Sequence, residues 1–355
     1  MINPAQKGDR IGQYRVDDLI ARGGMASIFR GTNLENGAPV AIKIPHPEME
    51  SDVVFYSRFQ READIGRKLD HPGVVKVLQV DDPERISMVM EWVEGRRLRD
   101  ILDEAGKLEP ERAVRIGANV CDALDYIHRQ GIVHRDLKPD NIMVDAGDGI
   151  KILDFGIARL DGARRLTFGK LSRSMGTPDY AAPERVKGKR GDARSDIYSV
   201  GVMLYEMIAG RVPFVDENPL LALNQRTVAD PPLLSESAPE IAPEIEEIVW
   251  RALQRDPVNR YPTAREFAAD LRSPGRVSPS DQIAAAHLMA ARSKLAHAHA
   301  LASPAMVHGM MGSAGTGAVE MPMPGKLSKF SWAYVLLALI PVVVFALLLL
   351  VAHEH

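Results

Sequence analysis

A carboxylate, an ammonium and an amide lie close together in one short loop of this chain. Asp136 could accept the proton of a substrate hydroxyl, Lys138 could neutralise a transferring phosphate, and Asn141 could ligate Mg²⁺ through a neutral oxygen. The apolar runs at 132–133 and 142–144 predict short buried strands on either side of the loop. On its own this group is a weak signal, because a charged surface turn would have the same composition. The loop becomes a strong indication of catalysis only if other groups in the chain could complete a phosphate site.

Two such groups come at the ends of predicted strands. Asp154 follows an apolar strand pattern and precedes a Phe-Gly pair, so its carboxylate is expected to project from a strand end. Lys43 ends a Val-Ala-Ile run, and an ammonium there is costly to bury without a carboxylate partner. The helical segment that follows offers Glu62, which we expect to be the partner, and Asp64 as the competing carboxylate.

A turn that contains glycine precedes Lys43 in the sequence. The strand predicted at 14–20 leads into Gly23 and Gly24, and an apolar pattern resumes at Ile28. Between two strands, such a turn lets backbone N–H groups approach phosphates without obstruction by side chains. An ordinary hairpin turn would look similar, but the position of this one ahead of Lys43 favours phosphate binding.

The order and spacing of these motifs resemble the catalytic domain of eukaryotic-type protein kinases over residues 12–272. The matching motifs are V-A-I-K at 40–43, H-R-D-x-x-x-x-N at 134–141, D-F-G at 154–156 and G-T-P-x-Y-x-A-P-E at 176–184. Lys138 and the last of these motifs point to the Ser/Thr class. The glycine turn is similar to that of bacterial membrane-associated Ser/Thr kinases.

The resemblance implies an α+β, two-lobed protein kinase fold, with a β-rich N-lobe at about 12–93 and a mainly helical C-lobe at about 96–272. It implies ATP, Mg²⁺ with Mn²⁺ as the alternative ion, and protein Ser and Thr hydroxyls as acceptors. The implied catalytic residues are Asp136, Lys138, Asn141 and Asp154, of which Asn141 and Asp154 would hold the metal. Asp196 would brace the catalytic-loop backbone, and Arg260 would pair with Glu184.

The nucleotide site implied by the resemblance contains the glycine turn, the Lys43–Glu62 pair and the segment that joins the lobes. Its residues are Ile20, Ala21, Arg22, Gly23, Gly24, Met25, Ala26, Ser27, Ile28, Ala41, Lys43, Glu62, Met90, Glu91, Val93 and Met143. Ala21 and Ala26 replace glycines of the family pattern. Gly66 replaces a larger side chain on the helix of Glu62 and is expected to weaken that helix by roughly 1 kcal/mol.

The long polar segment before Glu184 resembles an activation segment. The implied regulatory residues are Arg135, Thr167, Ser172, Ser174 and Thr177. Arg135 would bind a phosphate carried by Ser172 or Ser174, which lie nearest the docking motif, with Thr167 as the next candidate. Thr177 is assigned instead to the substrate-docking end of the segment.

Composition fits a packed globular protein, with 46% hydrophobic and 26% charged residues. A net charge of −3 gives no field that would attract nucleic acid, so no nucleic-acid partner is expected. The single cysteine, Cys121, lies in an apolar helical pattern and is expected to be buried. With one cysteine there is no internal disulfide, which fits a reducing compartment. Residues 1–10 lack the apolar core of a signal peptide.

Beyond residue 272 the composition changes to an Ala-, Gly-, Pro- and Met-rich linker at 273–328, within which 281–302 has helical character. Four histidines follow the boundary, and an exposed polar face is a better explanation for them than a metal site: His287, His297, His299 and His308. Residues 332–352 carry no charge and predict a single C-terminal transmembrane helix of about 32 Å, against a hydrocarbon core of about 30 Å.

Lysines precede this span, so the positive-inside rule places the kinase domain on the cytoplasmic side of the cell inner membrane. The leading interpretation is thus a membrane-anchored Ser/Thr protein kinase that autophosphorylates its activation segment; whether it forms a homodimer stays open. A pseudokinase scaffold is the alternative suggested by Ala21, Ala26 and Gly66, although Lys43 and Asp136 are intact. A small-molecule phosphotransferase would share the chemistry without needing the docking motif.

Overall fold

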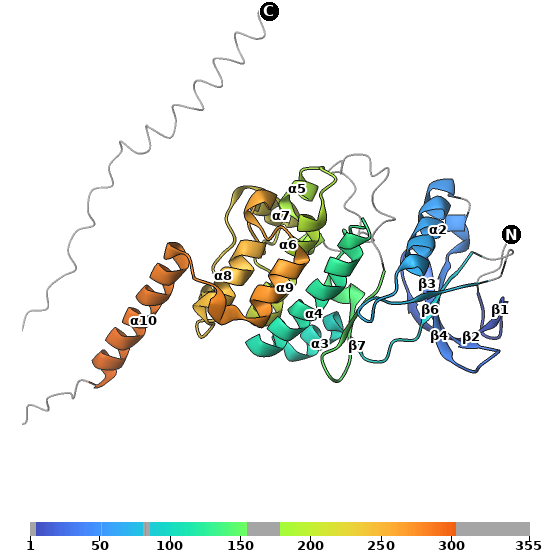
Figure 1. Ribbon diagram of the computed structural model, residues 1–355, viewed down its shortest axis with the longest axis horizontal. Helices are drawn as coiled ribbons and strands as arrows, with labels where there is room; N and C mark the ends of the chain where they lie inside the picture. The colour runs from blue at the N-terminus through green and yellow to red at the C-terminus, as the bar shows by residue number, and fades with distance from the viewer. Residues whose placement is uncertain (1–4, 51, 81, 83–85, 155–177, 303–355) are drawn as a thin grey trace, which may run out of the picture. The chain divides into compact units, whose positions relative to one another are not determined.

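The structure is a computed structural model that describes residues 5–50, 52–80, 82, 86–154 and 178–302 (Figure 1). The activation-segment positions Thr167, Ser172, Ser174 and Thr177 lie outside the described residues, as does the span predicted at 332–352. Within the described ranges, no helix is both long enough and apolar enough to cross a membrane.

The N-lobe is built on an antiparallel sheet whose strand order, over the described residues, is β1-β2-β3-β4-β6-β5. The strands are β1 (Arg10–Ile11), β2 (Tyr14–Arg22), β3 (Ala26–Asn33), β4 (Pro39–Pro45), β5 (Val77–Leu78) and β6 (Met88–Glu91). Along β4, Val40, Ile42 and Ile44 alternate with more exposed residues and are buried. This two-residue period places these three side chains on one face of the sheet and leaves Lys43 on the opposite face.

Two helices follow β4, the short α1 (Pro47–Glu50) and the longer α2 (Val53–Lys68). Asp52 caps α2, because its Oδ1 accepts hydrogen bonds from the N–H groups of Val54 and Phe55. A Cβ added at Gly66 would lie 2.3 Å from Cγ2 of Val77 on β5. Gly66 therefore lets α2 approach the sheet closely, a packing role that the sequence-based expectation of a weakened helix did not include.

The C-lobe is mainly helical and includes a small sheet of β7 (Arg96–Arg97), β8 (Ile142–Val144) and β9 (Ile150–Ile152). Its helices are α3 (Leu98–Ala105), α4 (Pro110–Arg129), α5 (Pro183–Val186), α6 (Ala193–Ala209), α7 (Pro219–Val228), α8 (Pro243–Ala252) and α9 (Ala264–Arg272), drawn from cyan to orange in Figure 1. On α4, Ile116, Val120 and Leu124 repeat at helical spacing and are fully buried. Cys121 is buried beside them, as expected.

The chain before the catalytic loop differs from the sequence-based prediction. Ile132 and Val133 do not form a strand. Gly131 has φ 73° where α4 ends, and the N–H of Ile132 donates to the carbonyl of Ile127 at 3.3 Å. The backbone here is used to end α4, so it does not enter a sheet. The strand predicted at 142–144 is present as β8.

A last described helix, α10 (Asp281–Ala302), confirms the helical character predicted for 281–302. Ile283 is fully buried, and Nε2 of His287 lies 2.5 Å from Oε2 of Glu246 on α8. The exposed polar face predicted for the linker histidines is therefore wrong for His287, because a buried carboxylate attracts it to the C-lobe. Among the described residues, no cluster of three or more His, Cys, Asp or Glu side chains could hold a metal ion.

Candidate active site

The loop before β8 is held by a buried carboxylate in the first turn of α6. Asp196 is fully buried, and its two oxygens accept hydrogen bonds from the N–H groups of His134 (2.8 Å) and Arg135 (2.7 Å). Nε2 of His128 lies 2.9 Å from the same carboxylate. Burial alone would raise the pKa of Asp196, but the hydrogen bonds that it accepts from His128 and from the backbone N–H of Arg135 hold it below its ordinary value. The expected bracing contact is thus present, and the carboxylate stays ionised.

Arg135 has a backbone conformation that side chains seldom adopt, with φ 66°. Asp196 holds its N–H, and the guanidinium of Arg185 donates to its carbonyl oxygen. These contacts on both sides of the residue stabilise the strained turn. The proposed phosphate-binding role of Arg135 involves a segment outside the described residues.

Asp136 and Asn141 are tied to each other through the backbone. Nδ2 of Asn141 donates to the carbonyl of Asp136 at 2.8 Å, and the N–H of Asp136 donates to Nδ1 of His134 at 3.3 Å. Burial lowers the pKa of His134, so its imidazole is neutral and can accept that bond. With Nδ2 committed, Oδ1 is the atom that Asn141 can offer to a cation.

Lys43 lies between two carboxylates. Its Nζ is 3.3 Å from Oε1 of Glu62 on α2 and 2.9 Å from Oδ1 of Asp154, just after β9. The expected contact with Glu62 is present, and the competing Asp64 instead pairs with Arg67. The direct contact between Lys43 and Asp154 was not predicted from the sequence, because Lys43 was expected to bind phosphate and Asp154 to bind the metal.

Lys43, Glu62 and Asp154 differ in how strongly their surroundings favour the charged form. Burial alone would lower the pKa of Lys43, but Asp154 and Glu62 raise it above its ordinary value. Burial also raises the pKa of Glu62 to about 7, against the opposing effect of Lys43. The pKa of Asp154 would rise with burial too, yet Lys43 holds it below the usual range. Asp154 is therefore the firmly ionised partner, and Glu62 is the carboxylate whose charge depends on its surroundings.

The oxygen donors on this side of the site suit Mg²⁺. Asp154 offers a carboxylate and Asn141 an amide oxygen, and the N–H of Leu153 donates to the carbonyl of Asn141 at 2.8 Å, which keeps the two residues together. Mg²⁺ is usually held by one or two protein oxygens together with substrate phosphates and water. These residues fit that pattern, and they lie where Lys43 could reach the same phosphates.

The predicted nucleotide-binding residues lie on β2, β3 and the turn between them, on β4, α2, β6 and β8, and, for Val93, just after β6. Met90 is buried opposite Ala41 in the β4–β6 pairing. The Glu91 carboxylate accepts from Nζ of Lys151 at 2.6 Å, and the Glu91 N–H donates to the carbonyl of Lys76 at 2.9 Å. The Glu91 N–H is therefore already paired, and the expected adenine contacts would need other backbone atoms of this segment, such as those of Val93.

The glycine turn joins β2 to β3. Arg22 pairs with Ser27 in the strand register, and the Gly23 N–H donates to the carbonyl of Ala26 at 2.9 Å. Met25 at the tip is 49% exposed. The turn is a closed hairpin whose tip carries an exposed apolar side chain, and Ala21 and Ala26, which replace family glycines, lie on the strands on either side of it.

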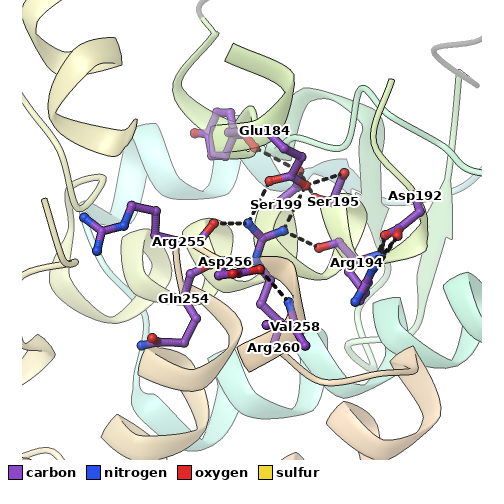
Figure 2. A network of polar contacts seen from close by, with 11 residues as sticks. Glu184, Asp192, Arg194, Ser195, Ser199, Gln254, Arg255, Asp256, Val258 and Arg260 are labelled. Atoms are coloured by element: carbon purple, nitrogen blue, oxygen red, sulfur yellow. Dashed lines mark hydrogen bonds and ion pairs between the residues drawn. The ribbon is translucent and has the colours of Figure 1, made fainter. Parts of the chain in front are cut away.

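A buried ion pair supports the docking end of the C-lobe (Figure 2). Nη2 of Arg260 lies 2.8 Å from Oε2 of Glu184, and Nη1 lies 3.0 Å from Oε1, as expected. The Ser195 hydroxyl donates to Glu184 at 2.6 Å. Burial alone would raise the pKa of Glu184, but the hydrogen bonds and charge of Arg260 lower it below its ordinary value. The pair is a bidentate, charge-assisted contact.

Sequence reasoning missed a second polar network at this end. The Tyr180 hydroxyl donates to Oε2 of Glu206 at 2.6 Å, and Nη1 of Arg99 donates to Oε1 of the same carboxylate at 2.8 Å. Glu206 is buried in α6. No sequence signal could have found this network, because Arg99 is 107 residues from Glu206 along the chain and has no fixed spacing to it.

Comparison with known proteins agrees with this geometry. A model of the protein kinase domain matches residues 14–270. The chain is 38% identical over 285 residues to a probable serine/threonine-protein kinase of Streptomyces coelicolor, covering 79% of this chain and 42% of that protein. It is 37% identical over 276 residues to the serine/threonine-protein kinase PknB of Mycolicibacterium smegmatis, covering 76% and 44%.

The chain therefore spans less than half the length of these relatives. Among solved structures, the kinase domain of Mycobacterium tuberculosis PknI is similar, with a TM-score of 0.60 and 27% identity. The match covers 76% of this chain and 100% of that domain.

Proposed function

We propose that this chain, which belongs to the protein kinase family and carries a kinase domain of the serine/threonine class, transfers the γ-phosphate of ATP to Ser and Thr hydroxyls of proteins. The observation that carries the proposal is the convergence of Asp136, Asn141, Asp154 and Lys43, through the catalytic loop and the Lys43–Asp154 contact. A base, oxygen ligands for a metal and a phosphate-binding ammonium are the parts that phosphoryl transfer requires.

The roles follow from the contacts of each residue. Asp136 accepts the proton of the attacking Ser or Thr hydroxyl, and Lys138, two residues further, offsets charge on the transferring phosphoryl group. Lys43 leaves Asp154 to contact the α- and β-phosphates, while Glu62 keeps its ammonium oriented. Magnesium held by Asn141 and Asp154 would neutralise negative charge on the β- and γ-phosphates.

Phosphate transfer to protein is tested with the purified full chain, ATP labelled on the γ-phosphate, Mg²⁺ and a Ser/Thr peptide mixture. We expect label on the peptides that disappears with EDTA and with Lys43→Met. A well-folded wild-type chain that binds ATP but labels neither peptides nor itself would favour the pseudokinase scaffold. The intact set of Lys43, Asp136, Asn141 and Asp154 argues against that scaffold.

Control by phosphorylation is part of the proposal. A loop phosphate at Ser172 or Ser174 would add about −1.5 to −2 charges that Arg135 could bind, and so order the segment. Phosphopeptide mapping after incubation with ATP, together with kinase assays of Ser172→Ala and Ser174→Ala singly and combined, tests this. Full activity in the double variant, with no phosphate between residues 157 and 176, would remove this part of the proposal.

Membrane anchorage is the remaining part of the proposed function, and it rests on the uncharged segment at 332–352. The kinase domain would then lie on the cytoplasmic side of the inner membrane. Deleting residues 330–355 should move the protein from the membrane pellet to the supernatant without loss of kinase activity. A deletion variant that still pellets with membranes would refute anchorage by this segment.

A further inference from the structure

His46 lies immediately after β4 and contacts the glycine turn with both its side chain and its backbone. Nε2 of His46 is 3.1 Å from the Ser27 hydroxyl, in a partly buried contact. The N–H of His46 donates to the carbonyl of Met25, at the tip of the turn, at 2.9 Å. One residue thus holds the turn at two points, three positions beyond Lys43.

The sheet itself cannot supply a hydrogen bond at this place. In the β3–β4 register, Ala26 pairs with Pro45, which has no N–H to donate to the ladder. The next backbone donor along the chain is the N–H of His46, which donates to the carbonyl of Met25. His46 therefore continues the attachment of the turn beyond the point where proline ends the ladder.

The same residue begins a chain of hydrogen bonds that leads to α2. The N–H of Met49 donates to the carbonyl of His46 at 2.8 Å, and the N–H of Asp52 donates to the carbonyl of Met49 at 3.2 Å. Asp52 in turn caps α2 through the N–H groups of Val54 and Phe55. The turn that would cover phosphates is thus linked, bond by bond, to the start of the helix that carries Glu62.

We propose that His46 is a positioning residue that couples the glycine turn to α2, so that closure of the turn over ATP and orientation of Glu62 toward Lys43 occur together. The inference rests on the proposed nucleotide site. The side-chain contact with Ser27 and the N–H bond to Met25 hold the turn, while the carbonyl of His46, which accepts from Met49, connects the same residue to α1 and the start of α2. An uncoupled surface contact between Ser27 and His46 is the simpler alternative.

The side chains of glutamine and asparagine distinguish the two explanations. Glutamine places a nitrogen near the position of Nε2 of histidine and should keep the bond to Ser27. Asparagine is also polar but reaches only as far as Nδ1, so it is the matched control. We therefore compare His46→Ala, His46→Asn, His46→Gln and Ser27→Ala in the full chain.

Hydrogen exchange of the ligand-free protein is the first measurement, because it does not depend on turnover. In His46→Ala and His46→Asn, amides of residues 23–28 and of the first turn of α2 should exchange faster together, while the last turns of α2 stay unchanged. His46→Gln should exchange like the wild type. Faster exchange in the turn alone would show that the two elements are not coupled and would overturn the proposal.

ATP binding is the second measurement. Loss of one neutral hydrogen bond should raise the Kd for ATP with Mg²⁺, measured by calorimetry, by about 2- to 10-fold. The KM for ATP should rise by a similar factor, and kcat should change less, because the bond acts in the ground state as well as in the transition state. His46→Gln should restore both values.

A double-mutant cycle completes the test. Ser27→Ala combined with His46→Ala should weaken ATP binding no more than His46→Ala alone, because both remove the same bond. Strictly additive losses, or a His46→Gln variant as weak as His46→Ala, would contradict the inference. If the wild-type chain transferred no phosphate at all, the proposed function would fail, but calorimetry and hydrogen exchange would still decide the role of His46.

Discussion

The two sides of the active site are held in different ways. On the C-lobe side, the fully buried Asp196 fixes the catalytic loop through two backbone N–H groups and His128. On the N-lobe side, the Lys43 ammonium is shared between two side chains, Glu62 and Asp154. The first arrangement is set before ligands bind.

The second arrangement has to change for catalysis. Asp154 would exchange Lys43 for a metal, and Lys43 would exchange Asp154 for phosphate. Under the proposed function, the position of Asp136 is built into the C-lobe core, whereas the electrostatics of the nucleotide side would respond to the ligand. The predictions below test this contrast.

The largest loss of stability is expected from Asp196→Asn. The amide would present a donor to N–H groups that need an acceptor and would remove the partner of His128, so the free energy of unfolding should fall by roughly 3–5 kcal/mol. Denaturant unfolding measures it. The matched control is Asp192→Asn, four residues earlier on the chain, where asparagine still caps the helix and only the exposed ion pair with Arg194 is lost, so the cost should be below about 1 kcal/mol. Equal losses in the two variants would mean that Asp196 is not a special anchor.

The N-lobe side is tested by combining Lys43→Met with Glu62→Ala. Because Asp154 also holds Lys43, Glu62→Ala alone should lose less activity than Lys43→Met alone. The pair should show a coupling free energy of roughly 0.5–3 kcal/mol in kcat/KM. Additive effects would mean that Glu62 does not act through Lys43.

Packing of α2 is tested at Gly66. Alanine there removes the helix cost of glycine, about 1 kcal/mol, but its Cβ overlaps Cγ2 of Val77. Overpacking typically costs about 1–3 kcal/mol, so Gly66→Ala should be destabilising on balance. In a Val77→Ala background the overlap is relieved and the same change should become neutral or stabilising. Destabilisation of the same size in both backgrounds would show that this close contact does not explain Gly66.

The smallest effect concerns acid stability. The pKa of Glu184 is lowered in the folded protein, where Arg260 opposes the effect of burial, so the unfolded state binds the proton more readily. The stability that Glu184 contributes is therefore complete above about pH 4.5 and is lost as pH falls through the folded-state pKa. The difference in unfolding free energy between wild type and Glu184→Gln should shrink on acidification below pH 4.5. A constant difference would mean that Glu184 does not titrate with folding.

Sequence reasoning succeeded where chemistry is encoded in local spacing. The positions of Asp136 and Asn141 on one loop followed from short motifs. The strand that carries Lys43 was also predicted, but its end was not, because β4 continues past Lys43 to Pro45. The pairing of Glu184 with Arg260 came from a resemblance that the structure bears out. These residues could be placed because each lies in a motif of fixed length.

What the sequence could not show depends on contacts between distant segments. Nothing in the spacing indicates that Arg99 contacts Glu206, or that His46, just after β4, contacts Ser27 on the neighbouring β3. Gly66 looked like a weak point of a helix because its neighbour Val77 comes from another element. Ile132 and Val133 looked like a strand because apolar composition does not show that the N–H of Ile132 is already used to end α4.

The proposed phosphate transfer requires Asp136 to act as the base of a preformed catalytic loop. The decisive measurement is the rate of γ-phosphate transfer by the purified full chain and by Asp136→Asn, with ATP affinity and thermal unfolding measured on the same samples. We predict that the variant folds and binds ATP like the wild type but transfers phosphate about 10²–10⁴-fold more slowly. A folded Asp136→Asn protein with wild-type turnover would contradict the account.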